Sequence, residues 1–333
     1  MTTTTTCAFH PKVETALSCS NCGQPACPDC LTPVAVGQHC DTCTKGKPAA
    51  GAKGSTGFKV KGAVVGHDEY QRLRRPSAMF FFVLALFIGS CVVAAFVDPS
   101  PLINDDGPIE TPAARVAAIF VVMSGAVLGL VFHEWAHAIV AYLGGDKSVA
   151  DKGYLTGDVR HYSHPFLSIV MPICFLLLGG LPLPGGAVWI QDQRLRSAWW
   201  RSAVSAAGPA INLLGGVMLY GIVLTGVLDD YAVLASALTF LAFIEVAMVI
   251  LNLLPIPGLD GYGVIEPHLP EGLRSLLAPL RQISFVLLLI FILSPASQFI
   301  FDWALALEEG LGVDPFFGYY GEQLASPRLY GDY

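Results

Sequence analysis

The sequence predicts an α-helical polytopic membrane protein that carries a small Cys-rich domain at its N-terminus. Of the 333 residues, 53% are apolar and only 14% are charged, whereas a soluble domain carries about 25% charged residues. The mean hydropathy is +0.57. Seven of the nine cysteines lie between Cys7 and Cys43. These features exclude an ordinary soluble enzyme and a disordered chain.

Cysteine content and charge divide the chain into four predicted regions. The first is a Cys-rich head over residues 1–43, and the second is a flexible linker over 44–75 with eight basic and two acidic side chains. A membrane body over 76–306 and a C-terminal tail over 307–333 follow. The strongly basic linker directly before the apolar part is the feature from which the orientation in the membrane can be read.

The body contains six apolar runs that are long enough to cross or enter a bilayer, whose hydrocarbon core needs about 20 residues. They cover residues 77–97, 113–143, 165–190, 202–228, 231–259 and 282–301. We therefore expect five to six hydrophobic helical segments, of which the third is unusual because Gly and Pro interrupt it at GGLPLPGG.

The Lys/Arg bias places the head in the cytoplasm, because the basic linker precedes the first run. Arg194, Arg196 and Arg201 place the start of the fourth run inside as well. Residues 144–196 must then begin and end in the cytoplasm, so we interpret 165–190 as a re-entrant hairpin packed against protein. The alternative is a full span, which would put the three arginines outside. The hairpin topology predicts an external C-terminus.

The sequence HEWAH lies inside the second apolar run. His133 and His137 are four residues apart, so they share one helix face and can hold Zn²⁺, with Glu134 as a general base. The pattern alone also arises by chance, but ionisable side chains inside a membrane helix are costly and functional by default. A catalytic zinc takes a third protein ligand. Asp260, presented by the Pro-broken segment NLLPIPGLDG, is our candidate.

HEWAH, GPAIN at 208–212 and NLLPIPGLDG occur in the order found in the site-2 protease family of intramembrane zinc metalloproteases, which this chain resembles. The resemblance implies His133, His137 and Asp260 as zinc ligands and Glu134 as catalytic base. It also implies that Asn252 positions or stabilises the reacting carbonyl. Two departures are Gly258, where the family often has proline, and Glu245, where an uncharged polar residue is more usual.

The head contains four short metal-binding knuckles, in which paired ligands are separated by two residues. This spacing predicts two zinc sites and resembles the interleaved pattern of B-box zinc fingers. The first site would use Cys7, His10, Cys27 and Cys30, and the second Cys19, Cys22, Cys40 and Cys43. His39 could replace Cys40. A disulfide framework is the alternative, but the thiols of a cytoplasmic head stay reduced and their number is odd.

The predicted function is that of an intramembrane zinc endopeptidase. It would hydrolyse peptide bonds in or near the transmembrane helices of a membrane-bound substrate, as in regulated intramembrane proteolysis. Its cofactors would be one catalytic and two structural Zn²⁺ ions, and its partners a transmembrane protein, the lipid bilayer and a protein that binds the head. Nucleic acid is not expected, because the head has few basic residues.

Two other functions remain open at this point. The first is a non-catalytic membrane scaffold whose head recruits partners, although such a protein could lose Glu134. The second is a metal transporter, which would need further intramembrane carboxylates or histidines, and only Glu245 qualifies. The expected location is the bacterial plasma membrane.

Overall fold

The computed structural model describes the head in part and most of the body. The described residues are 5–10, 13–15, 19, 24–33, 38–40, 75–97, 103–104, 107–108, 111–161 and 188–325. The chain forms two compact units, residues 1–66 and residues 67–333. The predicted linker up to residue 74, and residues 162–187, which include most of the predicted hairpin, lie outside the described part.

The head unit is built from two short antiparallel strand pairs. β1 (Thr5–Thr6) pairs with β2 (Glu14–Thr15), and β3 (Leu31–Pro33) pairs with β4 (Gln38–Cys40), with the 3₁₀ turn η1 (Pro28–Cys30) before β3. Its buried cluster consists of five cysteines with Ala26 and Leu31. Among the described residues of the head, the thiols therefore occupy the place that a hydrophobic core takes in a larger domain.

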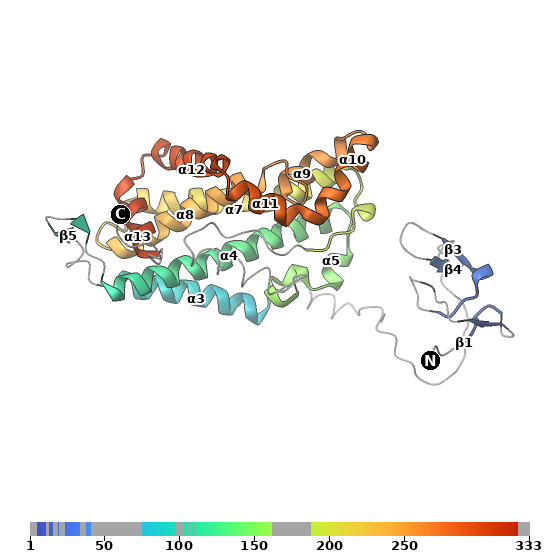
Figure 1. Cartoon of the computed structure of the whole chain (residues 1–333). Coiled ribbons are helices and arrows are strands. Elements are labelled where there is room, and N and C mark those ends of the chain that lie inside the picture. Colours follow the sequence, from blue (N-terminus) through green and yellow to red (C-terminus); the bar gives the residue numbers. More distant parts are fainter. Residues whose placement is uncertain are drawn as a thin grey trace. The chain divides into compact units, whose positions relative to one another are not determined.

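Five helical stretches of the body are long and apolar enough to cross a membrane, which confirms the predicted fold class (Figure 1). They are α3 (Ala78–Ala95), α4 (Pro112–Gly144), α7 (Ala198–Leu224), α8 (Ala232–Asn252) and the stretch Glu271–Ile292, which comprises α10 (Glu271–Leu277), η7 (Ala278–Ile283) and α11 (Ser284–Ile292). The shorter elements up to the end of α7 are β5 (Ile103–Asn104), β6 (Gly107–Pro108), α5 (Ser148–Asp151), η2 (Tyr154–Thr156), η3 (Val159–His161) and η5 (Asp192–Arg194).

Hydroxyl side chains cap the first three membrane-length helices of the body, because they accept hydrogen bonds from otherwise unpaired backbone amides. Ser77 caps α3, accepting from the amide of Phe80 at 3.1 Å. Thr111 caps α4 ahead of a proline at its first position, and Ser197 caps α7. α4 stops at Gly145, whose φ of 125° is a conformation that favours glycine.

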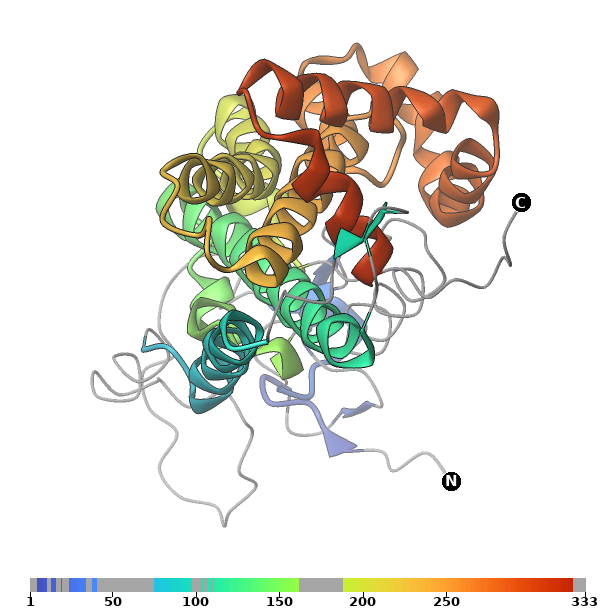
Figure 2. The same ribbon diagram turned by 90° about the vertical axis from the view of Figure 1, so that its left-hand side faces the viewer.

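α8 lies at the centre of the body, enclosed by α4, α7 and the C-terminal helices when the bundle is viewed end-on (Figure 2). Of its membrane-length window 78% is buried, against 17% for α3. α7 comes close to it at Gly216, where a Cβ atom would stand 3.2 Å from the carbonyl oxygen of Ala242. The central helix thus forms a rigid support for the elements that follow it in sequence.

The single helix expected over residues 282–301 is not found. The apolar stretch begins earlier, at Glu271, and stops at Ile292. After it come η8 (Pro295–Ser297) and α12 (Gln298–Gly310). The break has a local cause: Pro295 has no amide hydrogen to continue the helix, and the Ser294 hydroxyl accepts from the amide of Ala296 at 3.3 Å.

The region predicted to be a C-terminal tail contains a further helix, α13 (Pro315–Ala325). Tyr320 and Leu324 are buried in the same apolar cluster as residues of α4 and α8. A Cβ atom on Gly321 would collide with the carbonyl oxygen of Ser236, so glycine permits this close contact with α8. The tail therefore contributes to the core of the body as far as Ala325.

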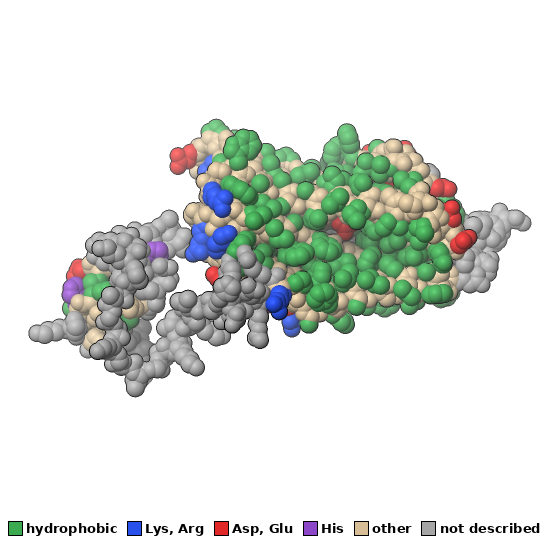
Figure 3. All heavy atoms as spheres, turned by 180° about the vertical axis from the view of Figure 1, so that it is seen from behind, with side chains coloured by type: hydrophobic (Ala, Val, Ile, Leu, Met, Phe, Trp, Pro, Cys, Tyr) green, Lys and Arg blue, Asp and Glu red, His purple; other side chains and the backbone are tan. Residues whose placement is uncertain are grey.

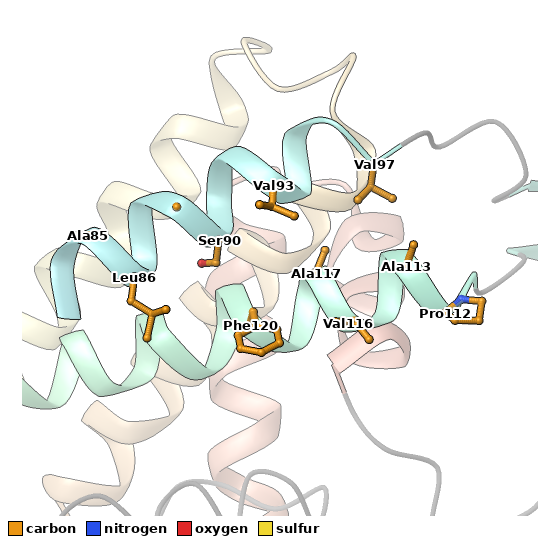
Figure 4. Close-up of a pocket in the computed structure, with 11 residues that line it drawn as sticks. Ala85, Leu86, Ser90, Val93, Val97, Pro112, Ala113, Val116, Ala117 and Phe120 are labelled. Atoms are coloured by element: carbon orange, nitrogen blue, oxygen red, sulfur yellow. The ribbon is translucent and has the colours of Figure 1, made fainter. Parts of the chain in front are cut away.

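α3 and α4 leave an apolar groove of about 830 Å³ between their facing sides. Figure 4 shows Leu86 and Val93 of α3 and Ala117 of α4 along it. Ser90 and Ser124 join the two helices beside the groove, with 3.1 Å between their hydroxyl oxygens.

Charged side chains collect at the two ends of the body. Figure 3 shows Lys and Arg gathered at one end and most Asp and Glu of the visible face at the other, with an apolar band between them. Such a band, flanked by opposite charges, is the surface expected of a protein that lies across a bilayer.

Candidate functional site

HEWAH lies on α4, and its two histidines and its glutamate are buried. His133, Glu134 and His137 are 6%, 5% and 7% exposed, respectively. One helical turn separates the two histidines, which brings their Nε2 atoms to 3.0 Å from each other. Two imidazole nitrogens so close together in a buried place need a cation or a shared proton between them.

Asp260 approaches the histidines from the other side. α8 ends at Asn252, and the following segment contains two prolines and Gly258, whose φ is +107°. Asp260 is then the first residue of α9 (Asp260–Ile265), which η6 (Glu266–His268) follows. Its Oδ2 lies 3.2 Å from His133 Nε2, and its Oδ1 lies 3.4 Å from His137 Nε2. The structure thus brings the three predicted ligands together.

The donor set fits zinc. One atom from each of the three side chains lies within 4.8 Å of the other two. Two imidazoles and one carboxylate are a ligand set found in catalytic zinc sites, in which three protein ligands leave a fourth position open.

The outer nitrogen of each imidazole has an acceptor on α7. His137 Nδ1 lies 2.6 Å from the carbonyl oxygen of Val204, and His133 Nδ1 lies 3.2 Å from the side-chain oxygen of Asn212. An Nδ1 that donates leaves Nε2 with a free lone pair directed at the metal position. These two partners therefore fix both the orientation and the tautomer of the histidines.

Gly208 of the GPAIN segment explains how α7 approaches so closely. A Cβ atom at this position would stand 2.6 Å from His133 Nε2 and would also collide with His137. From the sequence we expected GPAIN to allow close helix packing in general. The structure shows that the two imidazoles fill the space that the glycine leaves.

Glu134 and Asn252 also lie in the interior. The Glu134 Oε2 atom accepts a hydrogen bond from the backbone amide of Val188 at 3.0 Å, just after the undescribed part of the predicted hairpin. Asn252 is the last residue of α8 and is 3% exposed. Glu245, one of the two departures from the family pattern, packs its carboxylate against Gly129, one turn before His133 on α4.

A second cluster lies in the head unit, where Cys7, His10, Cys27 and Cys30 come together. His10 Nδ1 lies 3.2 Å from Cys27 Sγ and 3.3 Å from Cys30 Sγ. Cys27 Sγ and Cys30 Sγ are 3.6 Å apart. Three thiols and one imidazole within 4.8 Å match the donor sets of structural zinc sites. These are the four residues predicted for the first head site.

Half of the second predicted head site can be placed. Cys19 and Cys40 are both buried, and the amide of Cys40 donates to Cys19 Sγ at 3.2 Å. Cys22 and Cys43 lie outside the described residues. His39, the alternative to Cys40, is half-buried on β4 opposite Thr32.

The chain is similar in sequence to several bacterial proteins. It is 40% identical over 223 residues to a Mycobacterium tuberculosis protein named "Putative zinc metalloprotease Rip2", covering 66% of this chain and 82% of that protein. Its identity to the Mycolicibacterium smegmatis protein of the same name is 36% over 251 residues, or 75% and 93% of the two chains. Its identity to the Bacillus subtilis protein named "Putative zinc metalloprotease YwhC" is 29% over 187 residues, which cover 52% of this chain and 80% of that protein.

The chain belongs to the site-2 protease family of zinc metalloproteases. No family model matches it, and no solved structure matches it. The family assignment agrees with the motifs from which the resemblance was drawn, and it makes the protein a zinc metalloprotease.

Sequence reasoning missed two contacts of the candidate site, the carbonyl of Val204 and the side chain of Asn212. Val204 acts through its backbone, so its side chain gives no signal. Asn212 is the last residue of GPAIN, and a polar side chain within an apolar helix was a usable signal. Its partner could not be read, because the partner depends on how α7 lies against α4.

Proposed function

We propose that this metalloprotease cleaves peptide bonds in or near the transmembrane helices of a membrane-bound protein, as a step of regulated intramembrane proteolysis. One observation carries the proposal. His133, His137 and Asp260 converge inside a bundle of helices that are apolar enough to cross a membrane, and Glu134 lies on the same helix as the histidines. A peptide reaching this site must do so from within or beside the bilayer.

His133, His137 and Asp260 would hold the catalytic zinc. Bound there, zinc supplies Lewis acidity that acidifies a water molecule and polarises the scissile carbonyl. Glu134 takes the proton as the water oxygen forms its bond to the carbonyl carbon. As the carbon–nitrogen bond breaks, Glu134 returns the proton to the leaving amine. The amide of Val188 holds the Glu134 carboxylate in place, and the Asn252 side chain donates to the developing oxyanion.

The head would bind two structural zinc ions and recruit or regulate a protein partner. Cys7, His10, Cys27 and Cys30 would hold the first ion, and Cys19, Cys22, Cys40 and Cys43 the second. We place the head in the cytoplasm and the body in the bacterial plasma membrane. The gathering of basic side chains at one end of the body supports this orientation.

The test uses the full chain in liposomes together with a reporter protein that has one transmembrane helix. Glu134→Gln keeps the size of the side chain but removes the base, so cleavage should fall by at least about 100-fold. Bound zinc should stay unchanged, since Glu134 is not a ligand. Glu309→Gln, an exposed glutamate of α12, is the matched control and should cleave normally. Retained cleavage in Glu134→Gln would contradict the mechanism and favour a non-catalytic scaffold.

A further inference from the structure

A polar cavity of about 240 Å³ lies beside the three candidate zinc ligands. Val204 belongs to its wall, and the carbonyl of the same residue holds His137. Gly263, three residues after Asp260, lines it as well. The cavity is therefore separated from the candidate active site by a single layer of residues.

Hydrogen bonds join α7 to α9 and η6 beside this cavity. The Ser202 hydroxyl near the start of α7 donates to the carbonyl oxygen of Val264 in α9 at 2.6 Å, and it lies 3.0 Å from His268 Nε2 in η6. A Cβ atom on Gly263 would collide with the Ser205 hydroxyl, so the two helices touch here. The cavity is a built space between packed elements.

Five charged side chains line the cavity, and their balance is positive. They are Arg201, Arg274, Arg281, Asp192 and Glu266. Arg281 already forms an ion pair with Glu266. This leaves two guanidinium groups facing one exposed aspartate, an excess of one positive charge.

The two remaining guanidinium groups have donors without acceptors. The Nε atoms of Arg201 and Arg274 are buried, and neither has a hydrogen-bond partner within the described parts of the chain. Arg274 uses its Nη2 atom for the carbonyl oxygens of Pro267 and Leu269, both at 3.3 Å. A buried cationic donor without an acceptor is costly, and an anion in the cavity would supply acceptors to both atoms.

We propose that this arginine pocket, lined by Arg201, Arg274 and Arg281, binds a phosphate group. Guanidinium forks match phosphate oxygens better than any other side chain does. The volume equals roughly eight water molecules at about 30 Å³ each, which accommodates a phosphodiester headgroup. One excess positive charge is balanced by one phosphodiester. The phosphate can come from an anionic phospholipid or from inorganic phosphate in solution.

The pocket joins α7 to the segment that carries Asp260. Arg201 is in the first turn of α7, and Arg274 is in α10, which follows α9 and η6. A phosphate held by both would fix α9 between them and thereby hold Asp260 against the histidines. This effect on cleavage rests on the proposed function, whereas binding of the phosphate does not.

Native mass spectrometry of the full chain, released from bilayer discs of phosphatidylglycerol or phosphatidylcholine, tests the binding. Wild type should retain one phosphatidylglycerol more firmly than phosphatidylcholine, and Arg201→Gln with Arg274→Gln should lower this retention roughly tenfold, or about 1.4 kcal/mol. Arg196→Gln is the control. Arg196 is exposed and lies over the ring of Trp200, outside the pocket lining, so this variant should retain phosphatidylglycerol like wild type. The two single variants serve if the double variant does not fold.

Titration of phospholipid-free protein with inorganic phosphate separates the two sources. Binding that the arginine variants abolish supports the pocket with a soluble ligand, and selective retention of phosphatidylglycerol supports it with a lipid. Glu134→Gln should bind like wild type in both assays, so a failure of the proposed proteolysis leaves this result readable. Equal binding by wild type and the double variant would overturn the proposal. If the double variant binds phosphate and lipid like wild type but cleaves a substrate with acidic flanks more slowly, the pocket recognises the peptide instead.

Discussion

The head and the body each bring metal-ligating side chains within 4.8 Å of one another, but they do so in opposite ways. In the head the candidate ligands lie on short segments beside small strand pairs, and the described apolar cluster consists of five cysteines with Ala26 and Leu31. In the body the ligands come from α4 and α9, which three large apolar clusters support. From this difference we expect the head to need metal in order to fold, and the body to fold without it and then offer a site for metal.

The largest expected effect is that of removing zinc. A structural zinc contributes about 10–16 kcal/mol to a small domain, so chelation should unfold the head while the helices of the body persist. Hydrogen exchange of the full chain measures both at once. Amides of β3 and β4 should lose protection, and those of α8 should keep theirs. Protection of the head in the absence of zinc would show that its fold stands without metal.

A methyl group added at Gly208 should damage the body site while sparing the head. The new Cβ atom of Gly208→Ala meets both imidazoles, and such overpacking costs about 3 kcal/mol. Zinc affinity of the body should fall by roughly 100-fold, as measured by competition with a fluorescent chelator. Gly215→Ala is the control on the same helix, because no atom from another described element lies within 4 Å of its Cβ. Equal affinities in the two variants would contradict the close approach of α7.

A smaller effect is expected at the acceptor of His133. Asn212→Ala removes the oxygen 3.2 Å from His133 Nδ1, and loss of such a partner costs roughly tenfold in zinc affinity. Asn212→Asp keeps an oxygen at this place and should restore most of the affinity. If alanine and aspartate variants bind zinc equally well, the hydrogen bond does not orient the histidine.

Most of the side chains that cluster in the two candidate metal sites could be predicted from the sequence, because their spacing is local. His133 and His137 share a face on any helix, and the two-residue spacing of the head ligands is typical of metal knuckles. Asp260 needed the further inference that prolines unwind the segment before it. The tertiary partners Val204 and Asn212 could not be read, since they depend on how α7 packs against α4.

The course of the last apolar run was misjudged for a different reason. Ser294 and Pro295 are a visible break signal, but apolar residues on both sides suggested one continuous helix. Length and hydropathy alone do not show whether a single proline ends a helix that apolar residues surround. Gly318 and Gly321 lower the helix propensity of residues 315–325. Packing favours a glycine at both positions, because Gly318 lies against Glu308 of α12 and Gly321 lies against Ser236 of α8.

Zinc content and cleavage, measured together on three proteins, separate the two metal sites most directly. Full-length wild type, Cys27→Ser and His137→Ala are compared by native mass spectrometry and by cleavage of the transmembrane reporter. Cys27→Ser should lose head zinc and retain cleavage, whereas His137→Ala should lose the body zinc and all cleavage while the head stays loaded. Loss of cleavage in Cys27→Ser with the body zinc still bound would contradict the division of roles between head and body.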